Sequence, residues 1–209
     1  MNVPRDLGRT ALLCLVGGSA DAIAYLRFGT FVGAMTGNTV LIGINIAEGH
    51  AASALYHVAI VAVFLAAVIA TRAAFDLQMP VIVPLMLTAI MLGLSGLIAS
   101  PWGAALSAAA LGMQNAAVRR IGGVPVNTAF VTGDLIRLGT AVPEAGAPGP
   151  NREVVLLASA WVAYAAGAVL GAVALHLMPY PMIVPAVLAV AAGVVEATVE
   201  RRKSARESK

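Results

Sequence analysis

The stretch that decides the fold reads Phe31-Val32-Gly33-Ala34-Met35-Thr36-Gly37-Asn38-Thr39-Val40-Leu41-Ile42-Gly43. A second copy reads Asn127-Thr128-Ala129-Phe130-Val131-Thr132-Gly133-Asp134-Leu135-Ile136-Arg137-Leu138-Gly139. Both copies run from an extended, β-leaning segment into Thr-Gly-Asn or Thr-Gly-Asp and then into an apolar helical run. A Thr at the head of such a run is typical of a helix N-cap. Each copy therefore predicts a helix start at Thr36 or Thr132 that breaks a hydrophobic segment.

Composition predicts that the chain lies in a membrane. Of its 209 residues, 60% are hydrophobic and 11% are charged, and the mean hydropathy is +0.90. A soluble domain does not need so much apolar surface, whereas this length provides about six to eight spans at roughly 20 residues each. The prediction is an all-α polytopic membrane protein. The N-terminal segment is interpreted as a retained first span from about Thr10 to Leu26, because Asp21 interrupts its apolar run without a signal-peptide cleavage site.

Several function classes lack their usual residues in this chain. The formal charge is +3, and the basic residues lie mainly at span ends, where they indicate topology rather than nucleic-acid binding. Cys14 is the single cysteine, which excludes a disulfide within the chain and a thiolate metal site. The three histidines have no metal-ligand spacing, and no nucleophile–base motif or phosphate loop is visible. We therefore expect no enzyme activity, no cofactor, no metal and no nucleic-acid partner.

The two halves of the chain follow one plan. In each half a polar residue interrupts an apolar span, and the signature, a long apolar helix and a Pro-x-x-x-Pro opening follow in the same order. Three anchors in one order predict an internal repeat. The matched segments are 18–22 with 112–116, 53–74 with 154–177, and 80–84 with 181–185. The repeats cover about 10–99 and about 101–199 of a single transmembrane domain, and 200–209 is a charged tail that we expect to be disordered.

The number of crossings depends on the two signature helices. From Thr36 to Ala47 there are about twelve residues, or roughly 18 Å of helix, against a hydrocarbon core of about 30 Å. If each signature segment enters the membrane and returns to the same side, there are six full spans. Of the arginines at the ends of spans, Arg27 alone then lies on the non-cytoplasmic side. If both cross, there are eight spans, and four arginines fall outside: Arg27, Arg72, Arg119 and Arg120. The positive-inside rule favours six spans with both termini cytoplasmic.

Six spans have a consequence for symmetry. Three full spans per repeat is an odd number, so the two repeats are inverted relative to each other. Thr36 and Thr132 would then approach the midplane from opposite sides, each with free backbone N–H groups at a helix start.

Three strings carry a resemblance to a known family. Met35-Thr36-Gly37-Asn38-Thr39, together with Gln114-Asn115-Ala116 and Phe130-Val131-Thr132-Gly133, resemble the YoaK family of small bacterial inner-membrane proteins. The similarity covers essentially the whole chain. It implies location in the bacterial inner membrane and a shared topology, but no substrate, because the family's function is unknown.

Two carboxylates stand out near the breaks. Asp21 lies in mid-span, where an ionised carboxylate is costly and normally faces the protein interior or a cavity. Its structural alternative is a hydrogen bond to a neighbouring helix. Asp134 lies in the first turn of the second half-helix, where the macrodipole favours negative charge, and its alternative is a cap or an ion pair with Arg137. For a transporter, we expect Asp21 or Asp134 to carry a coupling proton or cation.

The other polar residues at the breaks form the candidate substrate site. The backbone amides of Gly37 and Asn38 are expected to hold an anionic group of a solute at the first half-helix. The full set of candidate substrate-binding residues is Thr36, Gly37, Asn38, Asn115, Thr132 and Gly133.

The function that these features favour is a small-solute transporter. Transporters keep their sites where helices are broken at the midplane, so we expect a secondary carrier with its site between two half-helix N-termini. A passive channel and a non-transporting scaffold remain alternatives, while an enzyme has weak support. A homodimer is expected, because six spans enclose little space. The small-residue stripe Ala163, Gly167 and Gly171 is usable for packing within the chain or between subunits.

Overall fold

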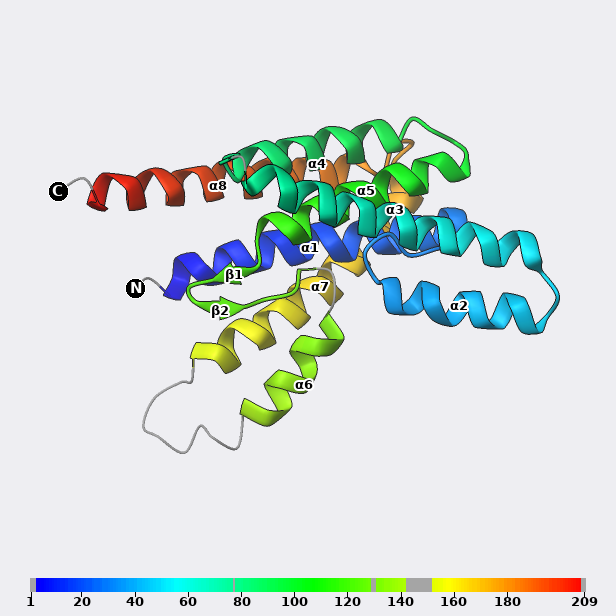
Figure 1. The fold of residues 1–209 in the computed structure, drawn as a ribbon, viewed down its shortest axis with the longest axis horizontal. Helices are drawn as coiled ribbons and strands as arrows, with labels where there is room; N and C mark the ends of the chain where they lie inside the picture. Colours follow the sequence, from blue (N-terminus) through cyan, green and yellow to red (C-terminus); the bar gives the residue numbers. More distant parts are fainter. Residues whose placement is uncertain (1–2, 77, 129–130, 142–151, 208–209) are drawn as a thin grey trace.

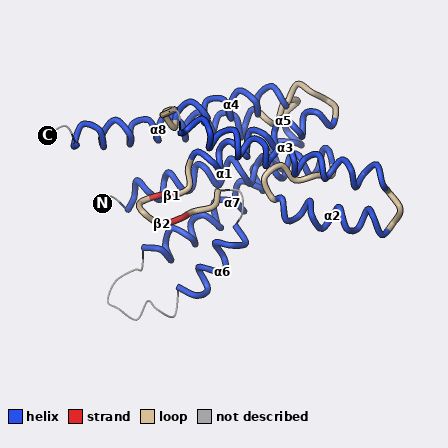
Figure 2. The backbone as a smooth tube through the Cα atoms, in the orientation of Figure 1, coloured by secondary structure: helices blue, strands red, loops and turns tan. Residues whose placement is uncertain are grey.

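The computed structural model describes residues 3–76, 78–128, 131–141 and 152–207, without the side chains of 131–132 and 202–207. Within these residues the chain forms eight helices and one short β-hairpin (Figures 1 and 2). The helices of the first half are α1 (Val3–Phe28), α2 (Met35–Ala47), α3 (Ala51–Asp76) and α4 (Ile82–Ser95). The second half contains α5 (Pro101–Ala117), β1 (Arg120–Ile121), β2 (Val124–Pro125), α6 (Val131–Ala141), α7 (Arg152–Leu177) and α8 (Ile183–Glu207).

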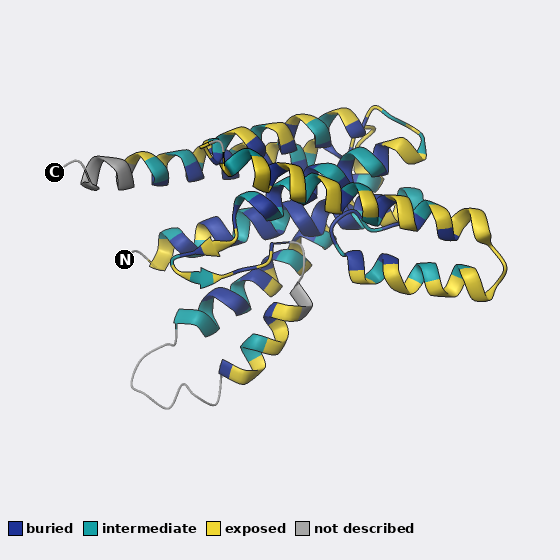
Figure 3. Ribbon diagram, in the orientation of Figure 1, coloured by how far each residue is buried: buried dark blue, intermediate teal, exposed yellow. Residues whose placement is uncertain are grey.

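Four of the described helices are long and apolar enough to cross a membrane: α1, α3, α7 and the part of α8 from Ile183 to Arg201. Shorter apolar helices include α2 and α4. Large apolar side chains on these helices are exposed, among them Ile69 at 60% and Leu177 at 77%. Figure 3 shows exposed residues along the helices. Backbone bonded within helices and an apolar exterior are what a lipid environment requires. The fold therefore supports a membrane protein.

The helices of the two halves pack in matching pairs. Helix α1 packs against α7, and α5 packs against α3. Helix α8 lies on α1, α4 lies on α5, and α4 and α8 also contact each other. The short helix α2 packs on α3, as α6 packs on α7. In Figure 1 each helix of the first half also runs in the opposite direction to its counterpart.

Small residues set the distance between α1 and α7. A Cβ added at Gly167 would lie 2.6 Å from the backbone oxygen of Leu15, and one at Gly171 would lie 2.4 Å from that of Ser19. The sequence left the stripe Ala163, Gly167 and Gly171 available for packing either within the chain or between subunits. The structure uses it within the chain, where it lets two backbones approach closely. It is not a free dimer surface, and a homodimer stays a prediction.

Gly18 provides the sharpest test of this packing. A Cβ at this position would lie 2.0 Å from the carbonyl oxygen of Tyr164 on α7, so the two helices would have to separate. Gly18→Ala should destabilise the protein by about 1–3 kcal/mol, the usual cost of overpacking. Gly8, also on α1, has nothing within 4 Å of an added Cβ, so Gly8→Ala should stabilise the helix by about 0.5–1 kcal/mol. Thermal unfolding in detergent measures both, and equal shifts would contradict the packing argument.

A buried ion-pair cluster joins three helices near the chain termini. Arg9 on α1 donates from Nε and Nη2 to the two carboxylate oxygens of Glu196 on α8, at 2.7 and 2.6 Å. Nη1 of Arg9 lies 3.2 Å from Oδ1 of Asp6, and Asp6 also accepts a hydrogen bond from Arg152 on α7. Gly122 has φ +58°, and an added Cβ there would overlap the Arg152 guanidinium. The cluster ties α1, α7 and α8 together.

Two local expectations are wrong. The predicted cap at Thr36 is absent, because α2 begins at Met35 after Ala34 and has no side-chain cap. The terminal segment is not disordered through residue 207, because α8 continues to Glu207. Its Glu, Arg, Lys and Ala residues are good helix formers that extend an existing helix.

The extended segments before the two short helices also differ from each other. Only the second forms strands, an antiparallel hairpin whose turn residues Gly122 and Gly123 both have positive φ, at 58° and 89°. Glycine accepts this backbone conformation without steric cost, and a Gly-Gly pair suits a two-residue hairpin turn.

Candidate functional site

The backbone break before α2 is wrapped around the side chain of Asp21. The N–H groups of Val32 and Gly33 donate to Oδ1 of Asp21 at 2.6 and 2.7 Å, and that of Ala34 donates to Oδ2 at 3.1 Å. The hydroxyl of Tyr164 on α7 donates to the same Oδ2. Asp21 is 2% exposed. Four donors around one buried carboxyl group suit its ionised form, which only accepts hydrogen bonds.

Asn38, in the first turn of α2, binds the start of the loop that precedes this helix. Its Oδ1 accepts hydrogen bonds from the hydroxyl of Thr30 and the N–H of Phe31, both at 3.0 Å, and its Nδ2 donates to the Phe31 carbonyl at 2.7 Å. The side chain is fully buried. Gly37 leaves room for the Phe31 ring, since an added Cβ would lie 2.7 Å from it. Asn38 therefore braces the break from the first turn of α2.

Asp134 makes the corresponding contact in the second half. Its carboxylate accepts hydrogen bonds from the N–H and the Nδ2 of Asn127, at 2.8 and 3.3 Å. Asn38 reaches back to Phe31 across the same separation of seven residues. The ion pair with Arg137 that the spacing offered is also present, at 3.7 Å. Asp134, like Asn38, braces the segment that precedes its helix.

A chain of polar side chains on α5 holds the second break. The hydroxyl of Thr128 donates to Oδ1 of Asn115 at 3.2 Å. Nε2 of Gln114 donates to the Thr128 hydroxyl at 3.2 Å and to the Leu13 carbonyl of α1 at 3.0 Å. Gln114 is fully buried, and its Oε1 accepts no hydrogen bond from any described residue.

The two breaks meet on the middle of α1. A Cβ added at Gly17 would lie 2.5 Å from the carbonyl oxygen of Thr128, so the second break touches α1 at Gly17. The first break touches it at Asp21. Four residues of α-helix rise about 6 Å, roughly one turn. The fold therefore brings together two interruptions that are far apart in the sequence.

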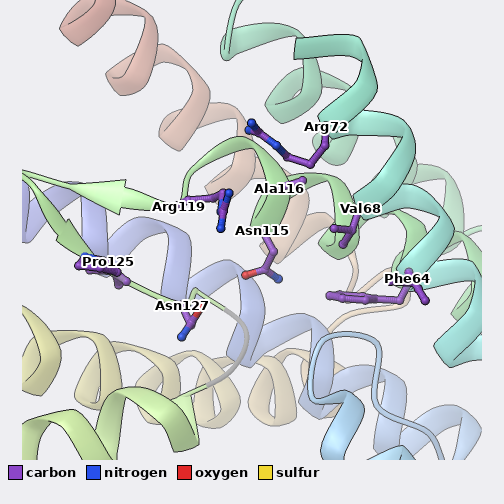
Figure 4. A pocket seen from close by; sticks show the side chains of 10 residues that line it. Phe64, Val68, Arg72, Asn115, Ala116, Arg119, Pro125 and Asn127 are labelled. Carbon is purple, nitrogen blue, oxygen red and sulfur yellow. The ribbon is translucent and has the colours of Figure 1, made fainter. Parts of the chain in front are cut away.

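An open pocket lies beside the second break (Figure 4). Its volume is about 480 Å³. Helix α3 contributes Phe64 and Val68 to one side, and Arg119 and Asn127 lie on the other, with Asn115 between them. The complete lining is Phe64, Leu65, Val68, Arg72, Asn115, Ala116, Arg119, Pro125, Val126 and Asn127.

The charge in this pocket is entirely positive. Arg72 and Arg119 line it, and none of its lining residues is acidic. Arg72 lies over the ring of Phe75, at 5.5 Å from its centroid, but neither arginine pairs with a carboxylate within the described part of the chain. Asn115 and Asn127 add amide groups next to the two guanidinium groups. The pocket is therefore suited to a small solute with negative charge or acceptor oxygens.

Of the residues that the sequence predicts for the substrate or coupling site, Asn115 lines the pocket. Asp21 and Asn38 instead bind the backbone before α2, and Asp134 binds the backbone before α6. The amides of Gly37 and Asn38, expected to hold an anion, instead donate to the Ala34 carbonyl at 2.9 and 3.4 Å, because helix α2 starts one residue earlier than predicted. Thr36 is exposed, as is Gly133. The side chain of Thr132 lies outside the described residues.

Sequence reasoning missed the residues that face the site from other helices. Arg72 and Arg119 were interpreted only as span ends, and Tyr164 and Gln114 received no role. A lone polar side chain inside an apolar helix was the available signal for Tyr164 and Gln114, as it was for Asp21.

Comparison with known proteins identifies a family but no activity. A family model described as a protein of unknown function (DUF1275) matches residues 10–195. No curated protein and no solved structure matches the chain.

Proposed function

Because the chain belongs to the DUF1275 family, whose function is unknown, we propose from the geometry that it is a small-solute membrane transporter. The observation that carries this proposal is the polar pocket beside Asn115 and Asn127, within a set of apolar helices. Polar and charged groups within a set of transmembrane helices usually face a cavity or mark a substrate path. In this pocket Asn115 is half-buried, while Arg72, Arg119 and Asn127 are exposed. The solute site is this pocket, at the second of the two backbone breaks.

We further propose that the chain forms two inverted repeats with six full crossings, α2 and α6 being half-helices. The matched packing pairs and the opposite directions of counterpart helices in Figure 1 support this arrangement. Both chain ends lie at the end of the molecule where α3 and α5 finish (Figure 1). By the positive-inside rule that end is cytoplasmic in the bacterial inner membrane, so the pocket opens inward.

The corresponding place at the first break contains a hydrogen-bonded carboxyl group, that of Asp21. Matching contacts relate Gly18 to Gly112, because an added Cβ would overlap the Tyr164 carbonyl at Gly18 and the Phe64 carbonyl at Gly112. Tyr164 donates a hydrogen bond to Asp21, whereas Phe64 has no hydroxyl group. The two breaks therefore differ, with a hydrogen-bonded Asp21–Tyr164 pair at one and a pocket beside the other, and this difference favours a carrier with alternating access over a passive channel or a scaffold. Coupling to a proton or cation through Asp21 or Asp134 stays a prediction, since both carboxylates already brace the backbone.

A flux measurement with a pocket-filling variant tests the transporter. Proteoliposomes are challenged with acetate, succinate, phosphate, glycine, glycerol or potassium chloride, and volume changes are followed by light scattering. At least one solute should cross faster than in protein-free vesicles. Val68→Trp, which narrows the pocket, should lower that flux about tenfold or more, a change that needs about 1.4 kcal/mol at the barrier.

The matched control is Ile69→Trp, which adds the same side chain at a position that is 60% exposed on the same helix. It should retain wild-type flux. A carrier also predicts a rate that saturates with solute concentration, and a linear rate would favour the channel. Vesicles that match protein-free vesicles for all six solutes, or equal flux in both tryptophan variants, would contradict the proposal.

A further inference from the structure

We propose that the pocket binds a small organic anion, with Arg72 and Arg119 as its counter-charges. This inference rests on the proposed function in that it assigns the solute of the same pocket.

The first half supplies its own anion at the corresponding place. Asp21 and Asn115 occupy matching positions, three residues after Gly18 and Gly112. In the first half the Asp21 carboxylate accepts four hydrogen bonds, one of them from Tyr164. In the second half Asn115 is neutral, and a pocket is open beside it. The second half thus lacks the negative charge that the first half contains.

Positive charge appears where the carboxylate is missing. Arg119 lies four residues after Asn115, and the residue four after Asp21 is Tyr25. Arg72 lies eight residues after Phe64, and the residue eight after Tyr164 is Ala172. The surroundings of the second break therefore differ from those of the first by the loss of one carboxylate and the gain of two guanidinium groups, Arg119 after α5 and Arg72 on α3.

The lining also restricts the kind of anion. Two guanidinium forks favour a carboxylate or a phosphate, which they bind through paired N–H donors. Phe64 and Val68 form an apolar wall opposite Arg119 and Asn127 (Figure 4). A fully hydrated inorganic ion gains nothing from such a wall. A volume of about 480 Å³ also exceeds that of a single oxyanion. An organic acid with a short apolar body matches both sides.

Direct binding tests this inference independently of flux. The purified full-length protein in detergent at low salt is titrated in a calorimeter with butyrate, succinate, inorganic phosphate and the uncharged butyramide. At least one organic acid should bind, and Arg72→Gln or Arg119→Gln should weaken it about tenfold or more, as expected for losing a charge-assisted hydrogen bond. Arg120→Gln removes the same charge from the next residue, outside the pocket lining, and should change affinity less than about twofold.

The combined results of the binding and flux experiments distinguish a failure of the anion site from a failure of the proposed transport function. Binding of an organic acid without flux would support the anion site and contradict transport. Flux of glycerol or glycine that Val68→Trp lowers, without binding of any anion, would overturn the anion site and leave the transporter in place. The anion site is also overturned if butyramide binds as tightly as butyrate, if phosphate binds more tightly than both acids, or if Arg120→Gln weakens binding as much as Arg119→Gln.

Discussion

Asp21→Ala is expected to unfold the first backbone break and to lower the stability of the whole protein by several kcal/mol. The change leaves the N–H groups of Val32, Gly33 and Ala34 without the acceptor that they share. Each orphaned buried donor costs about 1–3 kcal/mol. The Tyr164 hydroxyl loses the same partner, and the contact between α1 and α7 is weakened. Thermal unfolding in detergent and the yield of folded protein measure the loss.

Asp21→Asn should fall between the wild type and the alanine variant. Asparagine keeps one oxygen for the N–H groups of Val32 and Gly33, but its NH₂ group then faces the N–H of Ala34, which is also a donor. The matched control is Asn115→Ala. Oδ1 of Asn115 accepts one hydrogen bond from the described residues, that of Thr128, so this change should cost less than Asp21→Ala. Equal losses at the two positions would contradict the converging hydrogen bonds.

Arg9→Met is expected to produce the second large effect. It leaves the carboxylate of Glu196 buried without its bidentate partner and removes one of the cations beside Asp6. Breaking a buried ion pair by removing one partner costs about 3–5 kcal/mol, because the remaining charge stays away from water. The side chains of Arg9 and Glu196 are only 7% and 5% exposed, so solvent screening offsets little of this cost. A fall in unfolding temperature of the detergent-solubilised protein is the measurement.

A double-mutant cycle separates charge from packing in this cluster. Glu196→Met in the Arg9→Met background removes the orphaned carboxylate, so the double variant should be more stable than Arg9→Met alone. Glu48→Gln breaks a pair with His50 in which both side chains are about 60% exposed, and it should leave the unfolding temperature unchanged. If Glu196→Met lowers stability further in the Arg9→Met background, the pairing is not the source of the loss.

The helices and the breaks could be predicted from the sequence because both depend on short-range features. Runs of apolar residues predicted the long helices, and some observed ends lie close to those expected, as at Leu177. The polar ends were not predicted, because α1 already begins at Val3 and α8 continues to Glu207. The signature residues predicted the start of each short helix to within about one residue. The pairing of Asp134 with Arg137 also followed from spacing, since residues three apart share a helix face.

The partners of the polar residues could not be predicted in the same way, because they come from segments far apart in the chain. Asp21 binds backbone amides on the next loop and a hydroxyl group on α7, and only the packing of α1 on α7 through Gly18, Gly167 and Gly171 brings that hydroxyl group within reach. The amphipathic pattern of one helix does not encode which backbone its glycines will touch.

The sequence by itself determined that this protein is helical, apolar and built from two similar halves with a break in each. Hydropathy, glycine positions and repeated order are properties of neighbouring residues. Only the tertiary structure decided that both breaks meet on α1 and that a pocket opens between Phe64 on α3 and Asn115 on α5. A pocket is the space that packed helices leave between them, so its lining depends on how closely their backbones approach.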